Sequence, residues 1–237
     1  MTAICIDFWN TIVVAETGGE ARQHARLEAV REIGGKYRSD ITEELVQSAR
    51  KKVSEEFDQI WMGSQRTLTT DELVRGMMKF MDIAPTDNEI TELVRVFQES
   101  MYDGPPDLAP GLVETLEELS KKYPLAIISD TMFSPGRVLR EYLRRKNIYD
   151  YFSGFVFSDE IGVSKPDRKA FDSALEQTGA KAEGSWHIGD IQPTDILGAN
   201  RMGMKSILYT GISDAYVRDN TATNVSNDWV EIKEILL

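Results

Sequence analysis

The residues of this chain that could do chemistry stand at the ends of short apolar runs. In chain order they are a carboxylate, a hydroxyl, an ammonium group and a pair of carboxylates, namely Asp7, Ser129, Lys165, Asp190 and Asp195. A carboxylate can serve as the nucleophile of covalent catalysis, and hydroxyl and ammonium groups stabilise negative charge on transferring oxygens. Paired acidic oxygens are typical ligands of Mg²⁺. The set therefore predicts a nucleophile beside an anion-binding site and a metal site.

Five apolar runs predict the buried strands that position these groups, at residues 3–9, 125–130, 154–158, 185–190 and 205–209. They are nearly continuous in Ile, Val, Leu and Phe, which is typical of parallel strands covered on both faces. Stretches of helical periodicity separate them, so we expect a doubly wound α/β fold with a five-stranded parallel core. Such sheets carry their chemistry at the carboxyl ends of the strands, where Asp7, Ser129 and Asp190 all stand.

The segment between the first two predicted strands has a different pattern. It predicts about four helices and no strand, at residues 18–34, 41–60, 69–82 and 87–102. The runs at 69–72 and 85–87 combine Thr with acidic residues, which is typical of helix starts. We therefore expect an all-helical cap domain at residues 15–107, inserted after the first strand. Residues 1–14 and 108–237 would then form the catalytic core.

Four segments, taken in order, resemble the motifs of the haloacid dehalogenase superfamily. They read Ile-Cys-Ile-Asp-Phe-Trp-Asn-Thr at 4–11, Ala-Ile-Ile-Ser at 126–129, Val-Ser-Lys-Pro-Asp at 163–167, and His-Ile-Gly-Asp at 187–190 followed by Asp195. The helical insertion is similar to the first type of cap in that family. The resemblance covers essentially the whole chain, and it implies a hydrolase with a Rossmann-like core.

The resemblance also implies a catalytic role for each matching residue. Asp7 would be the nucleophile that forms a covalent aspartyl intermediate. Thr11 and Ser129 would donate hydrogen bonds to the transferring oxygens. Lys165 would neutralise charge on the nucleophile and on the phosphoryl group.

The implied cofactor is Mg²⁺. Its ligands would be Asp7, Asp190, Asp195 and the backbone carbonyl of Trp9, which lies two residues after the nucleophile. Magnesium prefers oxygen ligands and keeps several waters, so two or three carboxylates suffice. An indole side chain leaves the main-chain carbonyl in place, and the metal site can therefore survive at this position.

Trp9 nevertheless departs from the family's phosphatases, which have an Asp there as general acid and base. The indole N–H is not usefully acidic, and the lost function is worth about 10²–10⁴-fold in rate. We favour a Mg²⁺-dependent hydrolase of a small phosphorylated metabolite that works through Asp7. Three alternatives stay open: a metal-independent 2-haloacid dehalogenase-like enzyme, a phosphonatase-like hydrolase, and a phospho-ligand-binding protein with little turnover.

Asn10 and Asp130 are further candidates for substrate binding. Asn10 stands where the family usually has Gly, and Asn tolerates left-handed backbone angles, so the turn can persist. Asp130 follows Ser129 and is either a substitute acid near the pocket or an acceptor for loop amides. We favour the second interpretation of Asp130.

Other residues have simpler interpretations. Cys5, between two isoleucines, predicts a buried core thiol, and His187 inside a strand predicts a packed core residue. Phe57, Trp61 and Phe80 recur at helical intervals, which predicts that they form the core of the helical bundle.

Composition limits the partners and the location. The formal net charge of −12 disfavours binding to nucleic acid or to anionic membranes. A single cysteine fits a reducing compartment, and no apolar run reaches the ~20 residues of a membrane span. We expect a cytoplasmic monomer or homodimer whose partner is a small phosphorylated metabolite.

Overall fold

The computed structural model describes all 237 residues, and its centre is a parallel sheet of six strands in the order β5-β4-β1-β6-β7-β8. The strands are β1 (Ile4–Ile6), β4 (Leu125–Ser129), β5 (Phe152–Phe157), β6 (Trp186–Gly189), β7 (Lys205–Tyr209) and β8 (Asn224–Ser226). The prediction of a doubly wound parallel fold is confirmed. The strand missed is β8, a three-residue edge strand with only one apolar residue, so no apolar run marked it.

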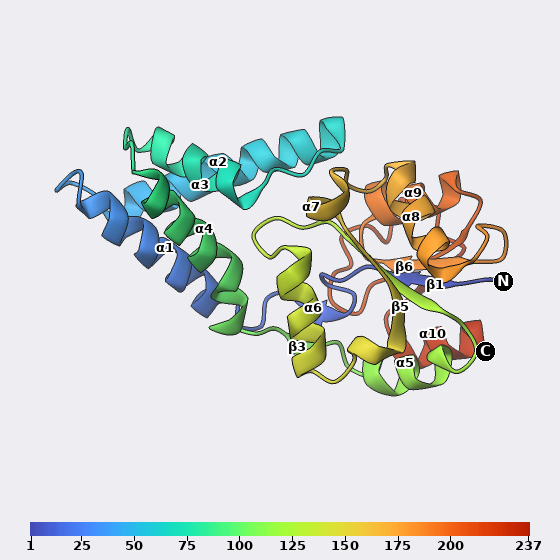
Figure 1. The fold of residues 1–237 in the computed structure, drawn as a ribbon. Helices are drawn as coiled ribbons and strands as arrows, with labels where there is room; N and C mark the ends of the chain where they lie inside the picture. Colours follow the sequence, from blue (N-terminus) through green and yellow to red (C-terminus); the bar gives the residue numbers. More distant parts are fainter.

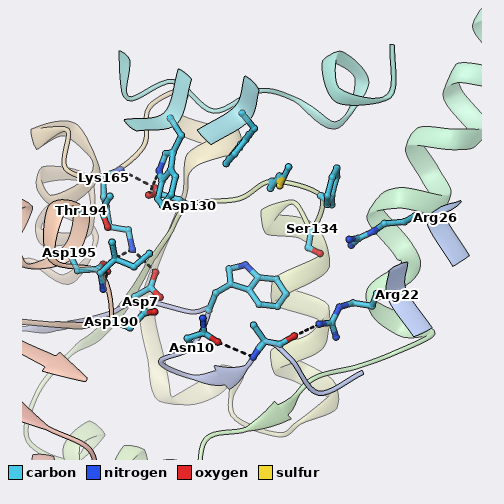
Figure 2. Close-up of a pocket in the computed structure, with 17 residues that line it drawn as sticks. Asp7, Asn10, Arg22, Arg26, Asp130, Ser134, Lys165, Asp190, Thr194 and Asp195 are labelled. Atoms are coloured by element: carbon cyan, nitrogen blue, oxygen red, sulfur yellow. Dashed lines mark hydrogen bonds and ion pairs between the residues drawn. The ribbon is translucent and has the colours of Figure 1, made fainter. Parts of the chain in front are cut away.

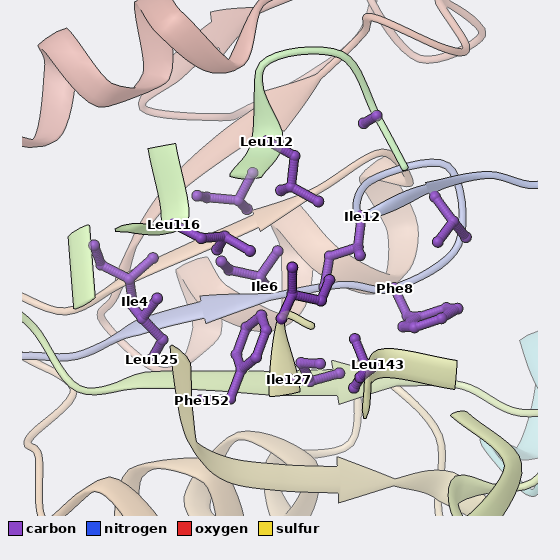
Figure 3. Close-up of a cluster of buried hydrophobic side chains, with 14 of the residues drawn as sticks. Ile4, Ile6, Phe8, Ile12, Leu112, Leu116, Leu125, Ile127, Leu143 and Phe152 are labelled. Carbon is purple, nitrogen blue, oxygen red and sulfur yellow. The ribbon is translucent and has the colours of Figure 1, made fainter. Parts of the chain in front are cut away.

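Helices cover both faces of this sheet, as Figure 1 shows. They are α5 (Leu112–Ser120), α6 (Gly136–Arg145), α7 (Ser158–Ile161), α8 (Arg168–Thr178), α9 (Leu197–Arg201) and α10 (Trp229–Leu236), with single turns η2 (Tyr149–Tyr151) and η3 (Gln192–Ile196). Side chains of β1 alternate between the faces. Ile4 and Ile6 pack in the cluster with α5, α6 and α10 (Figure 3). Cys5 packs against α8 on the other face and is buried, as predicted. The carboxyl end of β1 is thereby held rigidly at the sheet centre.

Four helices precede the second strand of the sheet and lie to one side of it, away from both termini (Figure 1). They are α1 (Gly19–Gly35), α2 (Glu43–Ser64), α3 (Thr70–Phe80) and α4 (Asp87–Glu99), followed by the turn η1 (Ser100–Tyr102). Thr69 and Thr86 each form a capping box at the predicted helix starts. The bundle has its own cluster of 17 buried apolar residues, separate from those of the sheet. Its treatment as a cap domain with boundaries at 15 and 107 stays a prediction.

One aromatic residue of the bundle is not where the sequence predicted it. Phe80 is 46% exposed, because the buried face of α3 follows Leu73, Met77 and Met81, and Phe80 points away from it. Phe57 is buried in the bundle as expected.

The two connections between bundle and sheet lie side by side. β2 (Val13–Val14) and β3 (Asp107–Leu108) pair as a short antiparallel ribbon that the sequence did not reveal. Gly18 has a φ of 68°, and a Cβ there would collide with the carbonyl of Gly104. The two connecting segments therefore touch at this point. Arg22 donates to the carbonyls of Ala15, Thr17 and Gly104 and thus ties both connections together.

None of the helices combines the length and the apolar character that crossing a lipid bilayer requires.

Candidate active site

The structure brings the predicted acidic residues together at the carboxyl edge of the sheet. Asp7 follows β1, Asp190 follows the neighbouring β6, and Asp195 lies in η3 one turn further. Carboxylate oxygens of the three residues lie within 4.8 Å of one another, and all three side chains are buried. Adjacent parallel strands end at the same edge, which explains why residues about 180 positions apart in sequence converge.

Lys165 supplies the single ammonium group of this cluster. Its side chain is 2% exposed, and Nζ donates hydrogen bonds to Asp7 Oδ1, to Asp195 Oδ1 at 2.7 Å and to the carbonyl of Ile128 at 3.0 Å. Burial disfavours the charged amine, yet the attraction of Asp195 and Asp7 raises the pKa of Lys165 above its usual range. The lysine therefore stays charged and orients the nucleophile candidate.

Asp195 is held by three donors. Oδ1 accepts from Lys165 Nζ and, at 2.8 Å, from His187 Nε2, and Oδ2 accepts from the amide of Ile191 at 3.1 Å. Burial alone would raise the pKa of Asp195, but Lys165 and His187 outweigh it and lower the pKa to about 2. His187 is fully buried as predicted, with its ring 5.2 Å from that of Phe171. Its contact with Asp195 was not foreseen.

The cluster carries more negative than positive charge. Burial and repulsion from Asp195 raise the pKa of Asp7 to about 7. The attraction of Lys165 lowers this pKa but offsets only part of the increase. Burial together with repulsion from Asp7 and Asp195 raises the pKa of Asp190 to about 8. Three close carboxylates sharing one ammonium group form a site that a divalent oxygen-seeking cation would neutralise.

Ser129 and Thr11 flank Asp7 but are more deeply buried. Ser129 is the last residue of β4, beside β1, and its Oγ makes only a long contact of 3.4 Å with the carbonyl of Asp130. Thr11 Oγ1 is buried without any hydrogen-bond partner. The Thr11 hydroxyl is thus free to donate, and the Ser129 hydroxyl makes only this long bond. Their predicted roles toward substrate oxygens stay predictions.

Trp9 places its indole at the mouth of the site. The residue is half-buried, with its ring 5.2 Å from that of Phe8 in an edge-to-face contact and 5.9 Å from the Arg22 guanidinium. Asn10 has a φ of 53°, which confirms the expected left-handed turn, and its Oδ1 accepts from the amide of Ala15 at 3.2 Å. No carboxylic acid occupies the Trp9 position, so the side chain there cannot transfer protons.

A cavity of about 310 Å³ opens above these residues, between the sheet and the helical bundle. Besides the acidic cluster, its walls include aromatic, sulfur-containing and cationic side chains: Trp9, Arg22, Arg26, Phe57, Trp61, Met132, Phe133 and Ser134. Figure 2 shows Asp7, Asp190 and Lys165 on one side and the two arginines of α1 on the other. The bundle thus supplies one wall of the site.

Three of these wall residues add to the sequence-based interpretation. Trp61 is half-buried: it packs against the bundle core as predicted, and it also lines the cavity, which was not predicted. Arg22 and Arg26 were passed over, although their spacing of four residues puts two cations on one face of a helix. That spacing was the available signal. His24, which lies between them, is exposed and does not line this cavity.

Asp130 connects the bundle to Lys165. Its Oδ2 accepts from Trp61 Nε1 at 2.9 Å, and its Oδ1 accepts from the amide of Lys165 at 3.0 Å. Burial raises the pKa of Asp130 to about 6. The bond to a loop amide matches the favoured interpretation. With both oxygens accepting, Asp130 acts in this arrangement as a hydrogen-bond acceptor.

The residues before α3 reinforce this connection. The amide of Ser164 donates to the carbonyl of Gln65 at 2.8 Å, and the hydroxyls of Ser164 and Thr67 lie 2.6 Å apart. The loop that carries Lys165 is therefore attached directly to the bundle. Arg66, between Gln65 and Thr67, pairs with Glu72 on the surface.

Comparisons with known proteins agree with this architecture. A family model described as haloacid dehalogenase-like hydrolase matches residues 40–209. A glyceraldehyde 3-phosphate phosphatase of Methanothermobacter thermautotrophicus is 36% identical over 135 residues, which cover 54% of this chain and 58% of the relative. A ribulose-1,5-bisphosphate 5-phosphatase of Halopiger xanaduensis is 24% identical over 208 residues, or 88% of this chain and 84% of that protein.

Among solved structures, a 2-haloacid dehalogenase of Pseudomonas syringae superposes with a TM-score of 0.75. It is 21% identical, and the match covers 100% of this chain and 98% of that structure. At this identity the likeness establishes the fold alone.

Proposed function

The chain belongs to the haloacid dehalogenase-like hydrolases, and we propose that it is a Mg²⁺-dependent phosphatase of a small phosphorylated metabolite that works through Asp7. The observation that carries this proposal is the cluster of three buried carboxylates around one lysine. A dehalogenase reaction needs no such excess of acidic oxygens. The two relatives are phosphatases of a triose phosphate and of a sugar bisphosphate, which supports the same reaction class.

The donor set fits Mg²⁺. Asp7 and Asp190 offer carboxylate oxygens within reach of each other, and the main-chain carbonyl of Trp9, two residues after Asp7, would be a further oxygen ligand. Asp195 shares one oxygen between Lys165 and His187 and gives the other to a backbone amide, which makes it the weakest of the proposed ligands. When bound, Mg²⁺ would neutralise the carboxylates and the phosphoryl oxygens.

In the proposed reaction, Asp7 Oδ attacks phosphorus and the bond from phosphorus to the ester oxygen breaks. The organic group leaves as an alkoxide or aryloxide that takes its proton from solvent, because Trp9 cannot supply one. Lys165 and the metal would favour the ionised form of Asp7, and Ser129 and Thr11 would donate hydrogen bonds to the phosphoryl oxygens. Water then attacks the aspartyl phosphate, releases inorganic phosphate and restores Asp7.

The direct test is hydrolysis of 4-nitrophenyl phosphate with Mg²⁺. This ester has a good leaving group, so turnover requires the nucleophile and the metal but no general acid. We expect hydrolysis that EDTA abolishes and that added Mg²⁺ restores. Activity that survives EDTA, together with chloride release from 2-chloropropionate, would instead identify a metal-independent dehalogenase. Absence of hydrolysis under all conditions would refute the phosphatase proposal.

Metal binding has a readout that is independent of turnover. With folded-state pKa values of about 7 and 8, Asp7 and Asp190 hold protons that an unfolded chain has already released above pH 4. The metal-free fold therefore loses stability as the pH rises from about 4 to 8. Mg²⁺ offsets this loss, so we expect it to raise the melting temperature by about 5 to 10 °C at pH 8. At pH 5 the increase should be much smaller.

The variant Asp190→Asn provides the control for that measurement. It removes one proposed ligand and one repulsive charge, so its metal-free form should be at least as stable as wild type at pH 8, and Mg²⁺ should hardly change its melting temperature. An equal shift at both pH values, or in wild type and variant alike, would contradict Mg²⁺ binding at this cluster.

One observation favours a second function. The Trp9 indole lines the cavity beside Asp7, in the space that a leaving group would enter. A protein that binds a phosphorylated ligand and barely turns it over would also retain the metal site. Such a protein would show Mg²⁺-dependent binding of phosphate esters in the same assays without release of nitrophenol.

A further inference from the structure

Arg26 is a cation without a counter-ion. Its Nε donates to the carbonyl of Phe97 at 3.2 Å and to Ser100 Oγ at 2.7 Å, while Nη1 and Nη2 have no hydrogen-bond partner in the protein. Burial, with repulsion from Arg22 and Arg50, lowers the pKa of Arg26 to about 9. No carboxylate offsets that repulsion. Arg26 is half-buried and lines the cavity, so an anion in the cavity could pair with its two free Nη groups.

Ser134 lies in the loop after β4, directly after the Phe133 that stacks on Arg26, and it too has an unused polar atom. The residue is 3% exposed and lines the cavity, yet its hydroxyl forms no hydrogen bond within the protein. Figure 2 shows the Ser134 hydroxyl and the Arg26 guanidinium pointing toward one another. Two free guanidinium nitrogens and a free hydroxyl, from separate parts of the fold, form a set of donors suited to an oxyanion.

The existing contacts of Arg26 account for its position but not for its charge. Its guanidinium stacks 4.6 Å from the Phe133 ring centroid, and Nε fastens α1 to the end of α4. Both contacts leave the Nη edge directed at the cavity. Arg22, by contrast, uses its nitrogens on three backbone carbonyls, so it adds positive potential without a free donor of comparable geometry.

The cavity is therefore polarised along its length. One end holds Asp7, Asp190 and Lys165, where the phosphoryl group is proposed to bind, and the other holds Arg26 and Ser134. Apolar side chains also line the cavity: Phe57, Trp61, Met132 and Phe133. The chain has a net charge of −12, but Arg22 and Arg26 face this cavity without a carboxylate partner. They therefore create a local positive potential.

We infer that the cavity selects phosphate esters whose organic part carries a second anionic group, and that Arg26 with Ser134 binds this group. The inference rests on the proposed phosphatase function, because it assumes that the phosphoryl group occupies the Asp7 end. The second group is a carboxylate or a phosphate, since both present planar or tetrahedral oxygens to a guanidinium. An apolar spacer between the two anions fits the walls.

Matched substrates test the inference. Phenyl phosphate is compared with its 3-carboxy and 4-carboxy derivatives and with 4-(phosphonomethyl)phenyl phosphate, so that the carboxylate and phosphate-like arms are measured separately. A hydrogen-bonded charge pair corresponds to about ten- to hundredfold in binding. We expect kcat/KM to favour at least one anionic derivative by that factor. Equal rates for all four esters would overturn the inference and leave the phosphatase proposal standing.

Variants then identify the group responsible. Arg26→Met keeps the apolar stem on Phe133 and should reduce the anionic-to-neutral ratio of kcat/KM to near one. Arg26→Lys should restore part of it. Because the ratio does not depend on the folded fraction, a destabilised variant still gives an answer. Ser134→Ala, which breaks no contact of the bundle, should lower the ratio a few-fold. Arg31→Met, on the exposed face of the same helix, should leave it unchanged.

A binding experiment separates this inference from the proposed reaction. Calorimetric titration with Mg²⁺ compares alkyl phosphonates with phosphonates that carry a carboxylate one to three carbons away, none of which can be hydrolysed at phosphorus. Tighter binding of a carboxylated member, lost in Arg26→Met, supports the anion site even if no ester turns over. A preference that persists in both Arg26→Met and Ser134→Ala would assign the second anion elsewhere and overturn the inference.

Discussion

Replacing Asp7 by Asn should abolish hydrolysis of 4-nitrophenyl phosphate, with a loss of kcat on the order of 10⁴–10⁶-fold as for other nucleophile deletions. The amide has the shape of the carboxylate but cannot attack phosphorus to give an acyl phosphate. Lys165 would keep its bonds to Asp195 and to the Ile128 carbonyl, so the site should remain assembled. The measurement is steady-state release of nitrophenol with Mg²⁺ in excess.

Stability provides the control for this variant. The amide of Asp7 donates to the Ile188 carbonyl at 2.8 Å, a main-chain bond that the substitution leaves intact. The variant also removes one of three mutually repelling carboxylates, so its melting temperature without Mg²⁺ at pH 8 should equal or exceed that of wild type. A loss of activity accompanied by unfolding would not identify the nucleophile.

Trapping the covalent intermediate would identify the nucleophile directly. Acid-quenched wild-type enzyme should carry a phosphoryl group on the peptide that contains Asp7, and Asp7→Asn should carry none. Labelling of another peptide, or residual activity above about 1% in the variant, would mean that water attacks phosphorus directly and that Asp7 only binds the metal.

The core of this site could be predicted from the sequence because strand ends converge. Asp7, Ser129 and Asp190 each end an apolar run, and a parallel sheet brings such ends to one edge whatever lies between them. The left-handed turn at Asn10 was also readable, since few residue types adopt it. These inferences depend on local pattern and on a single topological rule.

The wall supplied by the bundle could not be predicted in the same way. Whether Trp61 or Arg26 faces the cavity depends on how α1 and α2 rotate against the sheet, and helical periodicity gives only the existence of an apolar face. Phe80 shows the opposite error: its helical spacing predicted burial, but an aromatic residue at the end of a helix can point to solvent. The edge strand β8 was missed since edge strands need no apolar run.

Replacing Trp9 by Asp should raise the hydrolysis of alkyl phosphates by about 10²–10⁴-fold, if the rest of the site is competent. The introduced carboxyl group would stand where the indole now lines the cavity and could protonate the leaving oxygen and then activate water. Esters with good leaving groups gain little from such an acid. The quantity to measure is therefore the ratio of kcat/KM for ethyl phosphate to that for 4-nitrophenyl phosphate.

Trp9→Asn is the matched control, because it opens the same space and loses the same contacts with Phe8 and Arg22 but cannot transfer a proton. A rise of the ratio in the Asp variant alone would establish that the missing acid limits the natural protein. An equal rise in both variants would mean that the indole acts by filling the leaving-group space, which is the property expected of a ligand-binding protein. If neither ratio changes while Asp7 remains essential, the leaving group of the natural substrate needs no protonation, and the second anion near Arg26 becomes the main determinant of which ester is cleaved.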